Sequence, residues 1–272
     1  MSRSDGVVLR GEAEQRVPAG FRNEETLARI ITIASGKGGT GKTTTAAALA
    51  SSIAALGYKT LCIDFDVGLG NLDMILGMSD YAIVDFSDVI RGRQKLMHAC
   101  RECPRIKNLF FLAAPVNLSE SEPDKIAVLR MFREISDEFD YCIIDSPAGI
   151  GQGFRLAHIC SEMSIIVTFA ELPALKNAGR AVDVARTMNI NEIRLLINRA
   201  DKKKYIRMQT NIDDAIDTVG ARLIGIIRED PSVSYAVHEA TPLILYKKRQ
   251  SVYDYLDTAR RILGEDLPLK LR

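Results

Sequence analysis

A glycine-rich segment with two lysines is the part of the sequence best suited to chemistry. Residues 36–43 read Gly-Lys-Gly-Gly-Thr-Gly-Lys-Thr and fit the phosphate-binding pattern G-x-x-x-x-G-K-[ST]. Glycines let the backbone wrap around phosphates, and the N–H groups at the start of the following helix favour negative charge. The pattern therefore predicts a nucleotide phosphate site made of Gly36, Lys37, Gly38, Gly39, Thr40, Gly41, Lys42, Thr43 and Thr44.

Two side chains of this segment should carry most of the binding. Lys42 can bridge the β- and γ-phosphates, and the hydroxyl of Thr43 can bind Mg²⁺. Lys37 places a second positive charge in the same loop, and its repulsion with Lys42 is tolerable when an anion is bound. A Lys37 side chain that simply faces solvent is the alternative.

Carboxylates at the ends of two predicted strands could complete a hydrolytic site. Asp64 and Asp66 are two residues apart and can face the same side, while Asp145 ends an apolar run. We assign the attacking water to Asp66 and the hydrated Mg²⁺ to Asp64 and Asp145. Gly149 could bring its N–H close to the γ-phosphate. Capping of the following segment is the alternative for each strand-end carboxylate.

These residues need strands and helices that alternate along the chain. Short β-branched runs alternate with longer amphipathic stretches, which predicts an α/β fold with a mostly parallel, doubly wound sheet in one domain. The predicted strands are Ile30–Ala34, Thr60–Asp64, Leu109–Ala113, Tyr141–Asp145, Ser164–Phe169, Ile193–Asn198 and Leu223–Ile227. The predicted helices are Lys42–Leu56, Pro123–Phe139, Phe154–Cys160, Ala174–Met188, Ile212–Val219, Val233–Ala240 and Val252–Leu263.

The composition and the lack of long apolar segments argue against several classes of protein. The 272 residues carry a net charge of +1, so no overall field attracts nucleic acid or an anionic membrane. The N-terminus has no apolar signal segment, and no run of 18 apolar residues occurs, so a cytoplasmic protein is expected. Residues 1–28 are predicted to be a flexible tail, 29–266 the nucleotide-binding domain and 267–272 a short second tail.

Three further groups of residues carry weaker signals. Cys100 and Cys103 form a C-x-x-C in a polar stretch and are expected to be free surface thiols, with an iron–sulfur or redox pair as the lesser alternative. The basic segments 199–207 and 247–249 are expected to be solvated loops, with DNA binding as the alternative. Cys62, Cys142 and Cys160 lie in apolar runs and are expected in the core.

Several of these motifs resemble the MinD/ParA family of ATPases, and its MinD branch in particular. Lys37 to Thr43 resembles the deviant Walker A segment of that family. Residues 63–73 are similar to its switch I, and residues 145–150 are similar to its switch II. The similarity covers residues 29–266.

The resemblance implies a P-loop ATPase that converts ATP and water to ADP and phosphate with Mg²⁺. It implies that Lys37 reaches the phosphates of a second copy in an ATP-dependent homodimer, with Asn71 near the interface. It also implies that Asn198, followed by Arg199, lies where the base is bound, because an amide suits the adenine edge.

Cellular role and partners also follow only from the resemblance. It implies an ATP-dependent switch in the spatial regulation of cell division, with an activating or effector protein and a location at the inner face of the cell membrane. The segment 266–272 contains Pro268 and is too short for a stable interfacial helix, so membrane contact through it should be weak. A DNA-segregation ATPase, an ATPase like the flagellar-number regulators and an iron–sulfur scaffold ATPase stay open as alternatives.

Overall fold

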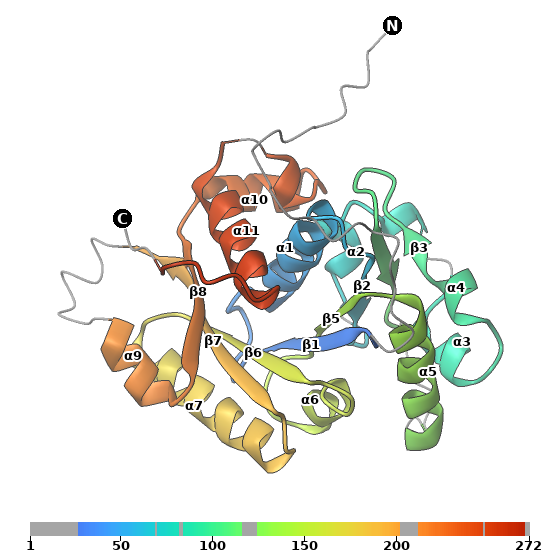
Figure 1. Ribbon diagram of the computed structural model, residues 1–272, viewed down its shortest axis with the longest axis horizontal. Helices are drawn as coiled ribbons and strands as arrows, with labels where there is room; N and C mark the ends of the chain where they lie inside the picture. Colours follow the sequence, from blue (N-terminus) through green and yellow to red (C-terminus); the bar gives the residue numbers. More distant parts are fainter. Residues whose placement is uncertain are drawn as a thin grey trace, which may run out of the picture.

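A mixed but almost entirely parallel sheet runs through the molecule (Figure 1). The computed structural model describes residues 27–68, 70–81, 84–115, 124–201, 212–246 and 248–269. Within these residues the strand order is β3-β4-β2-β5-β1-β6-β7-β8, and only the β3–β4 pair is antiparallel. The strands are β1 (Arg29–Ala34), β2 (Thr60–Asp64), β3 (Arg101–Glu102), β4 (Leu109–Leu112), β5 (Tyr141–Asp145), β6 (Met163–Thr168), β7 (Glu192–Ala200) and β8 (Arg222–Arg228).

Each of the seven predicted strands falls on an observed parallel strand, so the α/β prediction is confirmed. The strand that the sequence did not indicate is β3, which has two residues and pairs with the edge of β4. Such a short segment has no periodicity to detect, because alternation needs at least four residues.

Helices cover both faces of the sheet (Figure 1). One layer holds α1 (Lys42–Ala55), α2 (Leu72–Ile75), α10 (Pro231–His238) and α11 (Gln250–Ile262). The other layer holds α5 (Lys125–Glu138), α6 (Gln152–Ala157), α7 (Leu172–Thr187) and α9 (Ile212–Val219), with α3 (Phe86–Ile90) and α4 (Leu96–Ala99) beside α5. Two 3₁₀ turns, η1 (Ser79–Tyr81) and η2 (Leu243–Leu245), complete the described elements.

The strands are apolar on both sides because each side meets a helical layer. In β1, Ile31 and Ile33 join the core under α1 and α11, while Ile30 joins the opposite core under α5. Successive side chains of a strand point to opposite faces, so an uninterrupted apolar run is the pattern of a strand buried on both sides. This pattern fixes the sheet in the middle of the fold.

Local signals set several helix boundaries. Asp124 and Asp230 accept hydrogen bonds from backbone N–H groups at the starts of α5 and α10, as N-cap residues do. Gly57, just beyond α1, has a φ of 104°, a conformation that glycine adopts without steric cost. These boundaries follow from single residues and therefore lie close to the predicted ones.

The two predicted tails are only partly described. Residues 1–26 lie outside the described residues, whereas Ala28 is buried and its N–H donates to the carbonyl of Ser136. Residues 270–272 also lie outside, but the side chain of Arg261 donates to the carbonyl oxygens of Leu267 and Pro268. Residues 267–269 are therefore attached to the end of α11.

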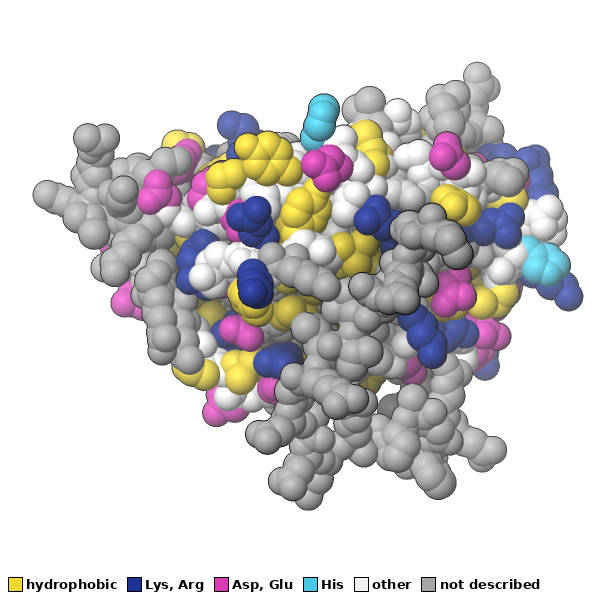
Figure 2. All heavy atoms as spheres, turned by 90° about the horizontal axis from the view of Figure 1, so that it is seen from above, with side chains coloured by type: hydrophobic (Ala, Val, Ile, Leu, Met, Phe, Trp, Pro, Cys, Tyr) yellow, Lys and Arg dark blue, Asp and Glu magenta, His cyan; other side chains and the backbone are white. Residues whose placement is uncertain are grey.

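Charged side chains of both signs are interspersed over the described part of the face seen from above (Figure 2). This mixture agrees with the net charge of +1. Most of the first basic segment, residues 202–207, and Lys247 of the second lie outside the described residues. Among the helices that the structure describes, none combines the length and apolarity that crossing a membrane would require.

The contact between β8 and α11 leads to a stability prediction. A Cβ on Gly225 would lie 2.3 Å from the hydroxyl oxygen of Thr258 on α11. We expect Gly225→Ala to lower the free energy of unfolding by about 1–3 kcal/mol, the usual effect of overpacking a core. Denaturant unfolding should show a much smaller effect of the same change in a Thr258→Ala background, because the obstructing side chain is gone. Equal effects in both backgrounds would contradict this explanation.

Candidate functional site

The glycine-rich segment connects the carboxyl end of β1 to the start of α1, as its sequence predicted. Gly41 precedes the helix with a φ of 88°. The hydroxyl of Ser35 donates to the carbonyl of Lys37 at 2.7 Å and shapes the beginning of the loop. The loop thus places backbone N–H groups at a helix N-terminus beside the edge where parallel strands end, which is the geometry of an anion site.

The two lysines of the loop lie in different environments. Lys42 is 7% exposed, whereas Lys37, Gly38 and Gly39 are on the surface. Thr40 is buried, and its hydroxyl oxygen has no hydrogen-bond partner among the described residues. A buried cation and an unsatisfied hydroxyl are unfavourable by themselves, so this loop is suited to an anionic ligand that satisfies both.

A backbone contact that the sequence did not reveal fixes the first glycine. A Cβ on Gly36 would lie 2.0 Å from the carbonyl oxygen of Asn177 in α7. Only glycine fits there without displacing the helix. Nothing in the spacing of the two segments could have indicated this contact, because they are joined only by the fold.

Two strand-end carboxylates lie side by side because β5 runs between β1 and β2. Asp64 and Asp145 are direct neighbours in the β2–β5 register. Asp145 is 1% exposed, and one of its carboxylate oxygens has no partner among the described residues. Thr43 is a hydrogen-bond partner of the same carboxyl, and Lys42 is close enough to affect it.

Burial is the main reason why the pKa values of these two carboxyl groups are raised. The pKa of Asp145 is raised to about 8, mainly by burial and also by the nearby Asp64, although the hydrogen bond from Thr43 lowers it. Burial also raises the pKa of Asp64 to about 6. A cation bound between Thr43 and Asp145 would favour the ionised carboxylate, so this donor set fits a hard ion such as Mg²⁺.

Asp64 caps the segment that follows its strand, which was the alternative to metal binding. One of its oxygens accepts from the N–H of Asp66 at 2.8 Å and the other from the N–H of Leu72 at 3.3 Å. A Cβ on Gly70 would lie 2.4 Å from the same carboxylate, so the loop closes tightly around it. Asp64 therefore organises the segment that carries Asp66, and its remaining lone pairs can bind the water of a hydrated ion.

The other predicted residues surround this centre. Asp66 is half-buried and close enough to Asp64 and Asp145 to raise the pKa of both carboxyls. Asn71 is exposed immediately before α2. Gly149 has a φ of 86°, and a Cβ there would meet nothing within 4 Å. The space that a side chain would occupy at Gly149 is therefore open.

Asn198, at the end of β7, reaches the phosphate loop from the opposite side. It is buried, and its Nδ2 donates to the carbonyl of Thr40 at 2.9 Å. Arg199 is exposed with a φ of 50°, and its guanidinium lies 5.4 Å from the ring centroid of Phe169. The structure therefore brings Asn198 to the site, while Arg199 lies at its margin.

A buried tyrosine that the sequence did not single out supports the first turn of α1. The hydroxyl of Tyr255 in α11 lies 3.3 Å from the hydroxyl oxygen of Thr45, and burial raises the pKa of Tyr255 to about 12. The sequence predicted a helix over residues 252–263 and gave no indication of this contact, because Tyr255 and Thr45 are brought together only by the fold.

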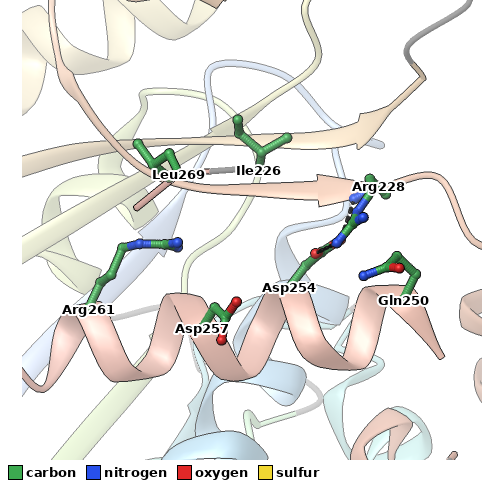
Figure 3. Close-up of a pocket in the computed structure, with 7 residues that line it drawn as sticks. All are labelled: Ile226, Arg228, Gln250, Asp254, Asp257, Arg261 and Leu269. Atoms are coloured by element: carbon green, nitrogen blue, oxygen red, sulfur yellow. Dashed lines mark hydrogen bonds and ion pairs between the residues drawn. The ribbon is translucent and has the colours of Figure 1, made fainter. Parts of the chain in front are cut away.

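A separate cavity of about 290 Å³ lies between β8 and α11 (Figure 3). Its lining residues are Ile226, Arg228, Gln250, Asp254, Asp257, Arg261 and Leu269. The N–H and the guanidinium of Arg228 both bind the carboxylate of Asp254, so this charge is already paired. None of the site residues predicted from the sequence lines this cavity.

The expectation of surface thiols at the C-x-x-C is wrong. Cys100 and Cys103 are both buried, and they belong to the two different cores on opposite sides of the sheet. The polar residues Arg101 and Glu102 between the two cysteines form β3, and the side chains of both cysteines are buried on either side of it. Cys62 and Cys142 are in the core as expected, whereas Cys160 is half-buried.

No cluster of three or more His, Cys, Asp or Glu side chains suited to a metal ion occurs among the described residues. The side chains of Thr43 and Asp145 are joined by a hydrogen bond, and a hydroxyl and a carboxylate are both oxygen donors of the kind that Mg²⁺ prefers.

Comparison with known proteins identifies the family. The family model for the CobQ/CobB/MinD/ParA nucleotide binding domain matches residues 31–243. The septum site-determining protein MinD of Bacillus subtilis (strain 168) is 36% identical over 250 residues, which cover 90% of this chain and 92% of that protein.

Solved structures agree with this match. A chain of the MinC:MinD cell division protein complex of Aquifex aeolicus superposes with a TM-score of 0.84 at 34% identity, covering 89% of this chain and 98% of that one. The septum site-determining protein MinD of Pyrococcus horikoshii OT3, solved with Mg-ADP, has a TM-score of 0.76 at 27% identity, with coverage of 89% and 100%. The chain described here therefore belongs to the CobQ/CobB/MinD/ParA nucleotide-binding family, and within it is a MinD-like ATPase.

Proposed function

We propose that this chain is an ATP-dependent switch in the spatial regulation of cell division, in which bound Mg·ATP joins two copies and hydrolysis releases them. The observation that carries the proposal is the convergence of Lys42, Thr43 and Asp145 at the start of α1, where one oxygen of Asp145 has no partner among the described residues. Relatives named for septum-site determination, and one solved with MinC, support a role beside an effector protein.

Within this proposal the loop binds the triphosphate. Its backbone N–H groups and Lys42 hold the phosphates, while Gly149 approaches the terminal phosphate through its backbone. Thr43 and Asp145 would hold the magnesium ion, and Asp64 would accept a hydrogen bond from water bound to it. When bound, the ion supplies neutralisation of charge on the phosphate oxygens.

Asp66 is the residue we assign to the attacking water. It is half-buried, it lies next to the ordered carboxylate of Asp64, and its position on the loop depends on the hydrogen bond from its N–H to Asp64. A carboxylate in that place can accept hydrogen bonds from water and orient it for in-line attack.

Lys37 and Asn71 are the residues we assign to the contact between two copies. Both are exposed on the described surface, and Lys37 lies in the loop that holds the phosphates. An exposed cation beside the phosphate site can reach phosphates bound by a second molecule without competing with Lys42 for the same position. We place this cycle in the cytoplasm and at the inner face of the cell membrane.

Lys42→Ala tests the phosphate site. We expect its affinity for Mg·ATP to fall by roughly 10–100-fold, because a charged hydrogen bond to phosphate is worth about 1.5–3 kcal/mol. Calorimetric titration of nucleotide-free protein measures the change, and Lys95→Ala, at an exposed lysine, is the matched control. Unchanged affinity in the Lys42 variant would exclude the assignment.

Asp66→Ala tests the assignment of the water. We expect the variant to bind Mg·ATP and to remain dimeric, because the phosphate contacts survive, and to hydrolyse it about 100-fold more slowly, because the attacking water is misplaced. Light scattering in saturating Mg·ATP and phosphate release measure the two properties. Asp213→Ala, at an exposed carboxylate on α9, should behave like the unchanged protein. A monomeric Asp66 variant that still binds ATP would reject the role.

Asp145→Asn tests the buried carboxylate through pH. Between the ordinary pKa of about 3.9 and the folded pKa of about 8, the folded protein holds a proton that the unfolded chain has lost, so stability falls as pH rises. The amide has no such proton. Without nucleotide or Mg²⁺, we expect the variant to gain Tm at pH 8, by about 2–4 °C per kcal/mol, and to gain roughly a third as much at pH 5, because most of the pH window lies above that value. An equal gain at both pH values would contradict the cause.

A further inference from the structure

The side-chain amide of Asn198 is occupied at both ends within the protein. Its Nδ2 donates to the carbonyl of Thr40 at 2.9 Å, and its Oδ1 accepts from the N–H of Arg199 at 2.9 Å. Because Asn198 is buried, these two bonds are made away from bulk water. One of the two N–H donors on Nδ2 and one of the two lone pairs on Oδ1 are therefore engaged by the backbone.

The bond to Thr40 determines which way one peptide group of the loop faces. All described peptide bonds are trans, and in a trans peptide the carbonyl and the next N–H point in opposite directions. With the carbonyl of Thr40 held toward Asn198, the N–H of Gly41 must point away from it. This peptide leads into Gly41, the N-cap residue of α1, where an N–H directed at a phosphate is useful.

Gly41 is matched to the same contact. Its φ of 88° lies in the left-handed region, and a Cβ there would lie 2.3 Å from Nδ2 of Asn198. Any side chain at position 41 would displace the amide from the carbonyl that it binds. Two constraints therefore favour glycine at position 41, the second fixed glycine of G-x-x-x-x-G-K-[ST]: the close approach of Asn198 and the positive φ.

The amide is held in turn by the residue that follows it. Arg199 has a φ of 50°, which only a few residues other than glycine adopt, and its guanidinium lies over the ring of Phe169. This conformation directs its N–H to Oδ1 of Asn198. The end of β7 therefore supports the phosphate loop through one rigid side chain.

We propose that Asn198 is a positioning residue that holds the phosphate loop in its binding conformation before the nucleotide arrives. The inference rests on the proposed function of the loop and adds a role that does not depend on the base. A loop that reaches its binding conformation only part of the time binds more weakly by that fraction, whatever the rest of the ligand contains.

A ligand without a base separates this role from base recognition. Nucleotide-free protein is titrated by calorimetry with Mg·ATP and with Mg·tripolyphosphate, for the unchanged protein, Asn198→Ala and the matched control Asn191→Ala, which alters an exposed asparagine at the other end of β7. We expect Asn198→Ala to weaken both ligands by the same factor, roughly tenfold, the effect of one or two lost buried hydrogen bonds. The control should change neither.

Hydrogen exchange on the nucleotide-free protein gives a second measurement that needs no ligand. We expect faster exchange in the peptide that contains residues 36–41 in Asn198→Ala, with unchanged exchange in the rest of α1 and in the sheet. This pattern also separates loss of the contact from global unfolding, and it decides the matter if tripolyphosphate binds too weakly to titrate.

The outcomes distinguish the possibilities. Loss of ATP affinity with unchanged tripolyphosphate affinity would overturn the proposal and assign Asn198 to the base alone. Unchanged affinities, or unchanged exchange in the loop, would also overturn it. If the unchanged protein bound neither ligand, the proposed function would fail, while the exchange measurement would still test the contact between Asn198 and the loop.

Discussion

The burial of Lys42 near the carboxyl group of Asp145, which in turn neighbours Asp64, is the constraint on which the rest of the structure depends. Charged groups are rarely buried unless they are paired, and here an oxygen of Asp145 lacks a partner among the described residues. A magnesium-bound triphosphate brings the opposite charges that such a group of side chains needs. The parallel order of β2, β5 and β1 is what keeps these side chains together, because each lies at or just beyond the carboxyl end of a strand.

Three contacts from neighbouring elements support the phosphate loop and the helix that follows it. Backbone atoms of α7 press against Gly36, the amide of Asn198 holds the carbonyl of Thr40, and α11 supports the first turn of α1 through Tyr255. These contacts come from three different elements, and they act on Gly36, on Thr40 and on the first turn of the helix that follows the loop. Support of this kind can hold a loop in one conformation before a ligand binds, which is the preorganisation that electrostatic catalysis requires.

Much of the fold could be predicted because the signals are local. The apolar runs identified seven strands, and the longer amphipathic stretches identified seven helices whose boundaries lie within three residues of those observed. The short helices α2, α3 and α4 were not predicted, because four or five residues show no clear periodicity. The glycine-rich motif located the phosphate loop for the same reason, since its residues are contiguous. The buried cysteines show the limit of local signals: Cys100 and Cys103 lie among polar neighbours, and only the path of the chain around β3 turns both inward.

The sequence by itself determined which elements form and which residue types meet phosphate, because periodicity and short-range spacing are properties of consecutive residues. Tertiary structure decided how those residues act on one another. Asp64 and Asp145 are neighbours in the sheet although they are 81 positions apart, and the hydrogen bond from Asn198 to Thr40 spans a longer separation. The raised pKa values of the two carboxyl groups follow mainly from their burial. Strand order and burial create these contacts, and neither can be read from the spacing of residues along the chain.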